Sequence, residues 1–135
     1  MATAMGLDDC VVFPGFLSMD DLFRYLATAD LGLDASLQEE VSPVKAMEYM
    51  ACALPLISFD LEQTRVICEG AADFAPPGDV ETLGALIVEL LRDPARRTEL
   101  GRAGERRVRE HLAWEQQALI YLEAIRRTRS GVQAP

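Results

Sequence analysis

The side chains best suited to chemistry in this sequence gather between positions 40 and 48. Glu40 and Glu48 are carboxylates eight residues apart, and Lys45 lies between them. Ser42 can cap the start of a helix, and Pro43 suits the first helical position because proline lacks the N–H that would stay unpaired there. A lysine beside the positive end of a helix attracts an anion such as phosphate, and a nearby carboxylate can accept hydrogen bonds from sugar or ribose hydroxyls. The segment therefore predicts a site for a nucleotide-sugar.

The same pattern also has a purely structural interpretation. Two glutamates eight residues apart are common in an acidic chain, and Ser-Pro before an apolar run is an ordinary helix start. The spacing of these residues does not decide between the two interpretations, so the surrounding sequence has to be considered.

The surrounding sequence alternates between strand-like and helix-like patterns. Short apolar runs suited to buried parallel strands alternate with segments in which apolar residues recur every three or four positions. Such alternation predicts an α/β fold, with a partial Rossmann-like, doubly wound parallel sheet followed by two C-terminal helices. Ligands bind such sheets beyond the carboxyl ends of the strands. We expect strands at 11–13, 31–34, 54–59 and 73–75, and helices from Ser18, at 43–52, around 63–69, after Asp79, and at about 95–111 and 114–128.

The charge of the chain is unevenly distributed. The 135 residues carry a formal net charge of −9. Residues 1–91 hold 3 basic and 16 acidic side chains (−13), and residues 92–135 hold 10 basic and 6 acidic ones (+4). The acidic part would repel a polyanion, which excludes nucleic-acid binding there. The seven arginines between Arg92 and Arg109 are expected to form a solvated helical face, with contact to anionic lipid or to a partner as the alternative; their expected ion-pair partners are Asp93, Glu99, Glu105 and Glu110.

Composition offers no sign of a metal site, a disulfide framework or a membrane span. Cys10, Cys52 and Cys68 show neither paired nor metal-ligand spacing, which favours reduced thiols. No apolar run approaches the roughly 20 residues that a helix needs to cross a bilayer. The sequence therefore predicts a cytoplasmic protein.

Several pieces of the sequence match one family in the right order. Residues 48–56 read EYMACALPL, next to Glu40 eight residues upstream of Glu48. This resembles the donor-site region of retaining GT-B glycosyltransferases of the family 4 type, with its Glu-x7-Glu pair and its E-[AY]-M-A-x-G-x-P-[VIL] run. The likeness covers roughly residues 7–125 and includes VVFPG at 11–15, ADLGL at 29–33, APPGD at 75–79, RDP at 92–94, Gly101 with Gly104, and HLAW at 111–114.

That resemblance implies a role for each matched residue. Glu48 would hold the ribose hydroxyls of the nucleotide, and Glu40 would contact the donor sugar. The Ser42 turn, the backbone N–H groups of Val44 and Lys45, and the Lys45 ammonium would face the phosphates. The resemblance assigns no catalytic residue to this chain and implies no metal cofactor, with the nucleotide-sugar as co-substrate.

The resemblance also implies an incomplete enzyme. Residues 1–135 would form a single partial donor domain, the later part of a GT-B donor domain, with 94–129 as a C-terminal helical extension. The expected function is that of a fragment or split half of a glycosyltransferase, which transfers a glycosyl group to an unknown acceptor. The expected partners are the nucleotide-sugar and either the missing acceptor-domain half or a second copy at an exposed sheet edge, and peripheral contact with the inner membrane face stays open.

Three departures from the family pattern matter for function. Ala53 stands where the family usually has a glycine that ends the donor-site helix in a left-handed conformation. In residues 1–91 only Arg24, Lys45 and Arg65 are cationic, which predicts weak or absent donor binding by this chain alone. The stretch 39–45 also resembles a variant form, D-x-S-T-x-x-K, with one residue deleted, so Lys45 and Glu48 are firmer assignments than Glu40.

Two other functions remain open from the sequence. A non-catalytic Rossmann-like module derived from a glycosyltransferase would keep the half-fold and pair with another protein. A non-hydrolysing sugar-nucleotide epimerase with a GT-B-like fold is disfavoured, because the chain has a single histidine and no cluster of acidic bases.

Overall fold

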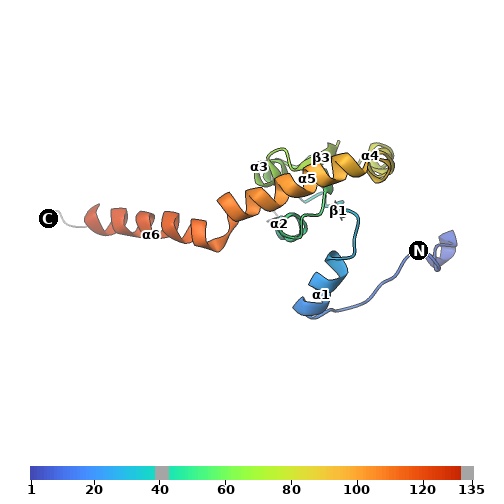
Figure 1. The fold of residues 1–135 in the computed structure, drawn as a ribbon, viewed down its shortest axis with the longest axis horizontal. Coiled ribbons are helices and arrows are strands. Elements are labelled where there is room, and N and C mark those ends of the chain that lie inside the picture. The colour runs from blue at the N-terminus through green and yellow to red at the C-terminus, as the bar shows by residue number, and fades with distance from the viewer. Residues whose placement is uncertain (39–42, 132–135) are drawn as a thin grey trace.

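The computed structural model describes the backbone of residues 1–38 and 43–131 and the side chains of residues 1–38 and 43–128. Figure 1 shows how these elements are arranged. In chain order they are η1 (Thr3–Met5), α1 (Met19–Leu26), β1 (Gly32–Asp34), α2 (Val44–Ala51), β2 (Leu56–Phe59), α3 (Glu62–Cys68), β3 (Ala72–Ala75), α4 (Val80–Arg92), α5 (Pro94–Arg107), the π-helical turn η2 (Val108–Leu112) and α6 (Trp114–Gly131).

Three parallel strands form one sheet in the order β1-β2-β3. Gly32 is in register with Leu56, and Leu56 with Ala72, so all three strands start level with one another. Helix α2 connects β1 to β2, and α3 connects β2 to β3. The predicted α/β fold with a parallel sheet is confirmed.

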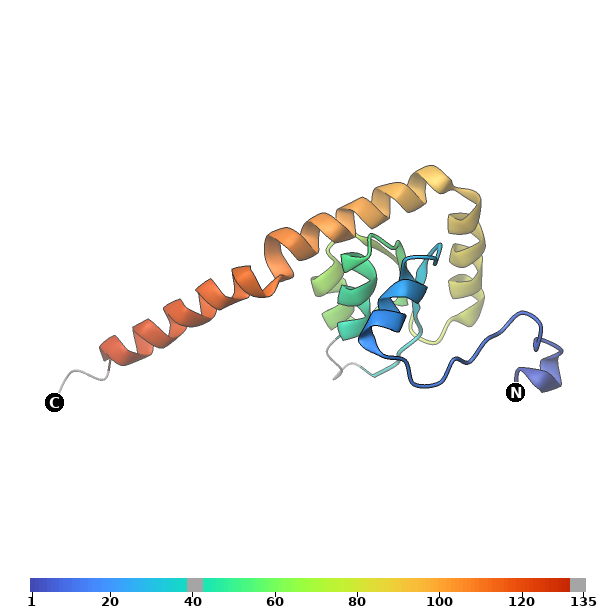
Figure 2. The same cartoon turned by 60° about the horizontal axis from the view of Figure 1, so that its bottom comes forward.

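Helices cover both faces of the sheet, which confirms the doubly wound arrangement. Side chains alternate between faces along β2. Leu56 joins Met50 and Cys68 in a core beneath α2 and α3. Ile57 and Phe59 point the other way, into a core formed with α4 and α5. Figure 2 shows α4 on the side of the sheet opposite α2 and α3.

Helix α2 ends in a left-handed residue that carries a side chain. Ala53 has φ 54°, a conformation that normally favours glycine. Its N–H donates to the Met50 carbonyl at 3.0 Å, and the Leu54 N–H donates to the Tyr49 carbonyl at 3.0 Å. These two bonds form a Schellman motif, so the family's glycine position keeps its backbone geometry here with alanine.

Helix α5 crosses the amino-terminal edge of the sheet at very close range. A Cβ atom on Gly101 would lie 2.1 Å from the Ala53 carbonyl oxygen, and one on Gly104 would lie 2.8 Å from Cγ of Met50. Only glycine allows these approaches, since protein interiors are close-packed. The two glycines matched in the sequence are thus explained by packing.

Two arginines of α5 hold the ends of neighbouring helices. Arg97 donates to the Leu90 carbonyl at 2.9 Å, at the end of α4. Arg107 donates to the Val66 carbonyl at 2.8 Å, near the end of α3. A cation at a helix C-terminus satisfies carbonyls that lack an intrahelical partner and complements the helix dipole.

The predicted solvated face of arginines is therefore only partly right. Arg96 pairs with Glu99 at 3.0 Å, and Arg109 lies 3.7 Å from Glu110. Asp93 instead caps α5 by accepting the Arg96 backbone N–H at 2.9 Å. Because Arg97 and Arg107 bind backbone carbonyls, part of the cluster serves to fix α5 in place.

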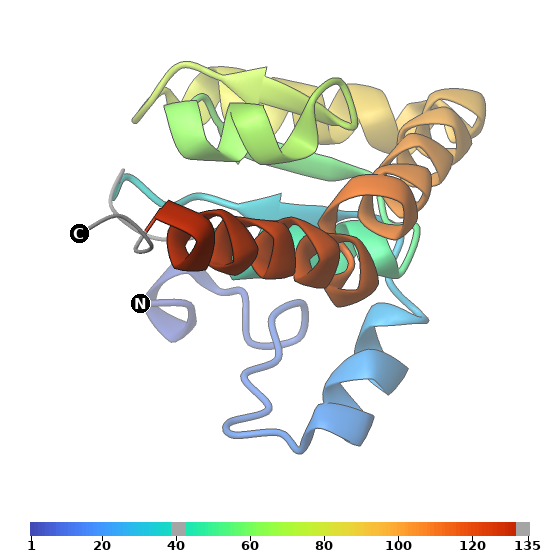
Figure 3. The same ribbon diagram turned by 90° about the vertical axis from the view of Figure 1, so that its left-hand side faces the viewer.

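Both ends of the described chain extend away from the sheet (Figures 1 and 2). Figure 3, which looks along α6, shows α1 and the residues before it on the β1 side of the sheet. Helix α1 begins as predicted, because the Ser18 hydroxyl accepts the Asp21 N–H at 3.2 Å. Its apolar stripe is poorly covered, with Phe23 41% exposed. Helix α6 projects from the other side of the body, and its Trp114 is 70% exposed.

The strand expected at residues 11–13 is wrong. The described chain has no strand before Gly32, and Phe13 is 80% exposed. A strand needs a neighbour to satisfy its backbone hydrogen bonds, and β1 pairs only with β2 in the described sheet.

Candidate functional site

Helix α2 places its first turn at the carboxyl end of β1. Its first residue is Val44, and Pro43 occupies the N-cap position with its carbonyl accepting the Met47 N–H at 3.2 Å. The helix thus starts one residue later than predicted, because ψ of Pro43 is 59° and not helical. The prediction that Ser42 caps the helix and that Pro43 is its first residue is therefore wrong, since Pro43 itself is the N-cap residue. Ser42 and Glu40, the expected sugar contact, lie outside the described residues.

Asp34 is a site residue that sequence reasoning missed. It is the last residue of β1 and is 3% exposed. Its Oδ1 accepts from Lys45 Nζ at 2.8 Å and from the Ser36 backbone N–H at 3.1 Å. A buried carboxylate is costly without a paired charge, and Lys45 supplies one. The available signal was a charged residue at the carboxyl end of an apolar strand, where ligand sites of this fold class lie.

A shallow pocket lies beside the Asp34–Lys45 pair. Its volume is about 20 Å³, which is room for roughly one water molecule. A larger ligand would therefore lie over these side chains and not within them. The pocket is lined by Asp34, Ser36, Gln38, Pro43, Lys45, Leu61 and Thr64.

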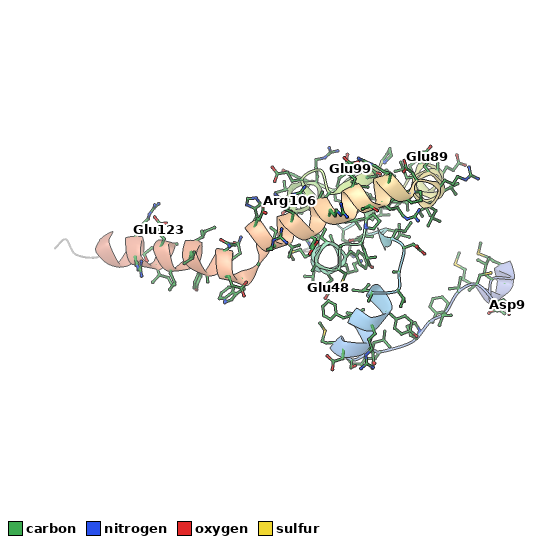
Figure 4. The ribbon with its side chains drawn as sticks, in the orientation of Figure 1. Asp9, Glu48, Glu89, Glu99, Arg106 and Glu123 are labelled. Carbon is green, nitrogen blue, oxygen red and sulfur yellow. The ribbon has the colours of Figure 1, made fainter. Side chains whose placement is uncertain are left out.

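Glu48 lies on the outer face of α2. It is two positions from both Ala46 and Met50, which are fully buried, so its side chain points about 160° away from each of theirs. Figure 4 shows Glu48 on the side of α2 away from α5. Within the described part of the chain its carboxylate makes no hydrogen bond or ion pair. It can therefore accept hydrogen bonds from a ligand.

The charges of this site reach the neighbouring side chains of α2. Burial raises the pKa of the Tyr49 phenol, and the Lys45 ammonium acts against that rise. Burial, helped by the Glu48 carboxylate, also raises the pKa of the Cys52 thiol. Neither group is therefore activated as a nucleophile, since activation requires a lowered pKa.

Each of the three basic side chains in residues 1–91 is already paired with an aspartate. Lys45 holds Asp34 at 2.8 Å, and Arg24 lies 3.5 Å from Asp21. Arg65 binds Asp60 through two nitrogens, one of them at 2.8 Å. A phosphate would compete with these carboxylates for each positive charge, so this part of the chain offers an anion little net attraction.

The described residues contain no group of three or more His, Cys, Asp or Glu side chains that could hold a metal ion. None of their helices combines the length and apolar character needed to cross a bilayer.

The sequence of residues 1–93 matches the family model described as "Glycosyl transferases group 1". The chain belongs to this family. The fold of this chain is the expected GT-B fold. The structure of the sucrose-phosphate synthase of Thermosynechococcus elongatus superposes on 96% of this chain with a TM-score of 0.87 and 29% sequence identity. The sequence-based recognition of a GT-B glycosyltransferase is thus confirmed.

The relatives that this chain matches are considerably longer proteins. The chain is 32% identical over 84% of its length to the amylovoran biosynthesis glycosyltransferase AmsK of Erwinia amylovora. It is 32% identical over 78% of its length to the GDP-mannose-dependent monoacylated alpha-(1-6)-phosphatidylinositol monomannoside mannosyltransferase of Corynebacterium glutamicum. It is 31% identical over 91% of its length to the MMP alpha-(1->4)-mannosyltransferase of Mycolicibacterium hassiacum.

The chain spans only about a third of each of these proteins, namely 31%, 29% and 31% of the three relatives and 33% of the synthase. The family match over residues 1–93 includes the whole sheet and α2. The comparisons therefore concern the region that contains Lys45 and Glu48.

Proposed function

We propose that this chain provides the donor-binding part of a glycosyltransferase and that a nucleotide-sugar binds at the carboxyl edge of its sheet. One observation carries the proposal. The first turn of α2 brings Lys45 to the carboxyl end of β1 and leaves the Glu48 carboxylate unpaired among the described residues, on the outer face of the same helix. A phosphate-binding group and a hydroxyl-binding group thus lie one helical turn apart.

Each residue has a role in this proposal. Glu48 accepts hydrogen bonds from the ribose hydroxyls, and Glu40 contacts the donor sugar. Ser42 and the N–H groups of Val44 and Lys45 contact the diphosphate. The positive end of α2 and the Lys45 ammonium then stabilise the charge that develops on the departing diphosphate. The reaction needs no metal ion in this scheme.

The names of two relatives suggest the donor. One is described as GDP-mannose-dependent and two as mannosyltransferases. GDP-mannose is accordingly the first nucleotide-sugar to test, with UDP-glucose and ADP-glucose as comparisons. The acceptor would be bound by polypeptide that this chain does not contain.

Binding by this chain alone should be weak. The three cations of the acidic part are engaged by aspartates, while a diphosphate brings close to two negative charges. We expect a Kd of about 1 mM or weaker. A Kd in the micromolar range would contradict this expectation.

The test is a titration of the ¹⁵N-labelled chain with GDP-mannose, followed by NMR. Glu48→Ala should weaken binding at least fivefold, because the ribose contact is lost. Glu105→Ala removes a glutamate from the exposed surface of α5 and should leave the affinity unchanged. Equal affinities of the wild type and Glu48→Ala would remove Glu48 from the site.

Activity offers a second test in a longer protein that contains this segment. Glu48→Ala should reduce turnover by roughly tenfold or more, equivalent to about 1.4 kcal/mol of transition-state stabilisation. Unchanged kcat and KM would contradict the role of Glu48.

The pairing of every cation in residues 1–91 favours one alternative function. A non-catalytic module derived from a glycosyltransferase would keep the sheet and have no need of free positive charge. A folded chain that shows no chemical shift change with any of the three nucleotide-sugars would support this alternative.

A further inference from the structure

Lys45 is the one lysine in the sequence, and a buried aspartate holds its ammonium group. The Lys45 side chain is 55% exposed, whereas the Asp34 side chain is 4% exposed. Most of the solvent-exposed surface of the pair therefore belongs to the lysine. The aspartate is fixed by the end of β1 and by the Ser36 N–H that it accepts at 3.1 Å.

The arrangement leaves the ammonium partly occupied and partly available. An ammonium group has three N–H donors. One donates to Asp34 Oδ1 at 2.8 Å, and the described residues give no partner for the other two. Lys45 lines the shallow pocket together with Ser36 and Thr64.

We infer that Asp34 is a positioning residue of the donor site. It holds the Lys45 ammonium at the carboxyl edge of the sheet before any ligand arrives and directs the two remaining N–H donors outward, toward a phosphate. A free lysine side chain would lose rotational freedom on binding, and a lysine that is already held has less to lose. This inference rests on the proposed function, because it assigns Asp34 to the phosphate end of the same site.

Asp34 also adds a negative charge near the phosphate, which opposes binding. Two substitutions separate this effect from positioning. Asp34→Asn and Asp34→Ala both remove the charge, but only asparagine keeps an oxygen that can accept from Lys45 and from Ser36. A difference between these two variants therefore reports on the held geometry alone.

The first measurement needs no ligand. Incorporation of lysine labelled with ¹³C at Cε gives a single NMR resonance, because Lys45 is the only lysine in the sequence. In the wild type the two Hε protons should differ in chemical shift and the Cε order parameter should be high for a half-exposed lysine. In Asp34→Ala the two shifts should merge and the order parameter should fall to that of a solvated side chain, with Asp34→Asn in between. Identical spectra for the wild type and Asp34→Ala would overturn the inference.

The second measurement follows the same resonance during titration with inorganic pyrophosphate. Asp34→Asn should bind pyrophosphate at least threefold more tightly than Asp34→Ala. Asp30→Asn is the matched control, since it removes an exposed aspartate four residues away. It should leave both the Lys45 resonance and the affinity for pyrophosphate as they are in the wild type. Equal affinities of Asp34→Asn and Asp34→Ala would overturn the role of Asp34 in binding.

The two measurements distinguish this inference from the proposed function. In one outcome the Lys45 side chain is immobile in the wild type and mobile in Asp34→Ala, but the chain binds no pyrophosphate. This result would contradict the proposed phosphate site and support the positioning of the ammonium by Asp34. A mobile Lys45 in a chain that does bind pyrophosphate would support the site and overturn the positioning.

Discussion

The two edges of the sheet are built from different kinds of contact. At the amino edge α5 passes so close to α2 that only glycine fits at position 101, and arginines hold helix ends by their carbonyls. At the carboxyl edge Asp34 at the end of β1 holds Lys45, and Asp60 just after β2 holds Arg65. The Glu48 carboxylate on α2 makes no hydrogen bond or ion pair with the described residues. Close backbone packing stabilises the first edge, whereas the second presents polar groups. The contrast agrees with the proposal that a ligand binds at the carboxyl edge, while the contacts at the amino edge hold the helices to the sheet.

The largest effect is expected at the amino edge. Gly101→Ala would place a Cβ atom 2.1 Å from the Ala53 carbonyl oxygen, and relief requires α5 to move. We expect a loss of about 3 kcal/mol in the free energy of unfolding, measured by urea denaturation.

Gly84→Ala is the matched control for that substitution. Its Cβ would meet no atom within 4 Å on α4. It should stabilise the chain by about 0.5–1 kcal/mol, because alanine is the better helix former. Equal stabilities of the two variants would show that α5 does not approach α2 as closely as described.

The next effect is expected at the carboxyl edge. Lys45→Met would leave the buried Asp34 carboxylate without its cation, and we expect a loss of about 2 kcal/mol in stability, since Lys45 is itself half exposed. The double variant Asp34→Asn/Lys45→Met should recover most of that loss, because no charge is then left buried. The stability of the wild type, of each single variant and of the double variant is measured by urea denaturation. If the loss in the double variant equals the sum of the losses in the two single variants, the two side chains are not coupled.

A smaller effect, of opposite sign, is expected where α2 ends. Ala53→Gly should raise the free energy of unfolding by about 1 kcal/mol, since glycine adopts the positive φ of this position without strain. Thermal unfolding should detect this as a higher Tm. A lower Tm would mean that Ala53 is not strained and that the family's usual glycine has another purpose.

The smallest effect concerns pH and the start of α4. Asp79 accepts the Thr82 N–H at 3.0 Å, and hydrogen bonds from the Thr82 backbone and side chain lower the pKa of Asp79. A lowered pKa means that its stabilisation is complete above the ordinary carboxyl pKa and is lost as the pH falls through the lowered value. Asp79→Asn, which still caps a helix, should therefore flatten the acid side of the Tm profile. An unchanged profile would exclude this carboxylate as a contributor.

Much of the fold could be predicted from the sequence because its signals are local. The apolar run before Phe59 predicts a central strand, and the Ser18 and Asp79 caps mark helix starts that the structure confirms. The strand at 11–13 failed because a strand is defined by its neighbour, and no described strand lies beside it. The arginine-rich stretch was misjudged in part because the carbonyls that Arg97 and Arg107 bind belong to other helices.

The candidate site could be predicted only where one helix carries it. The positions of Lys45 and Glu48 follow from the start and period of α2, although their roles stay predictions. A charged residue at the end of an apolar strand marks Asp34, but its pairing with Lys45 joins two elements across a loop and could not be predicted from the local sequence. The roles of Glu40 and Ser42 also stay predictions, because both lie outside the described residues.

The most direct test of a donor site at the carboxyl edge is a map of backbone amide shifts when GDP-mannose is added to the ¹⁵N-labelled chain. The largest changes should fall at the carboxyl edge, on Val44 to Glu48 of α2, while the amide of Gly101 at the amino edge stays unchanged. Changes centred on α5, or no change in a chain that is folded, would contradict it.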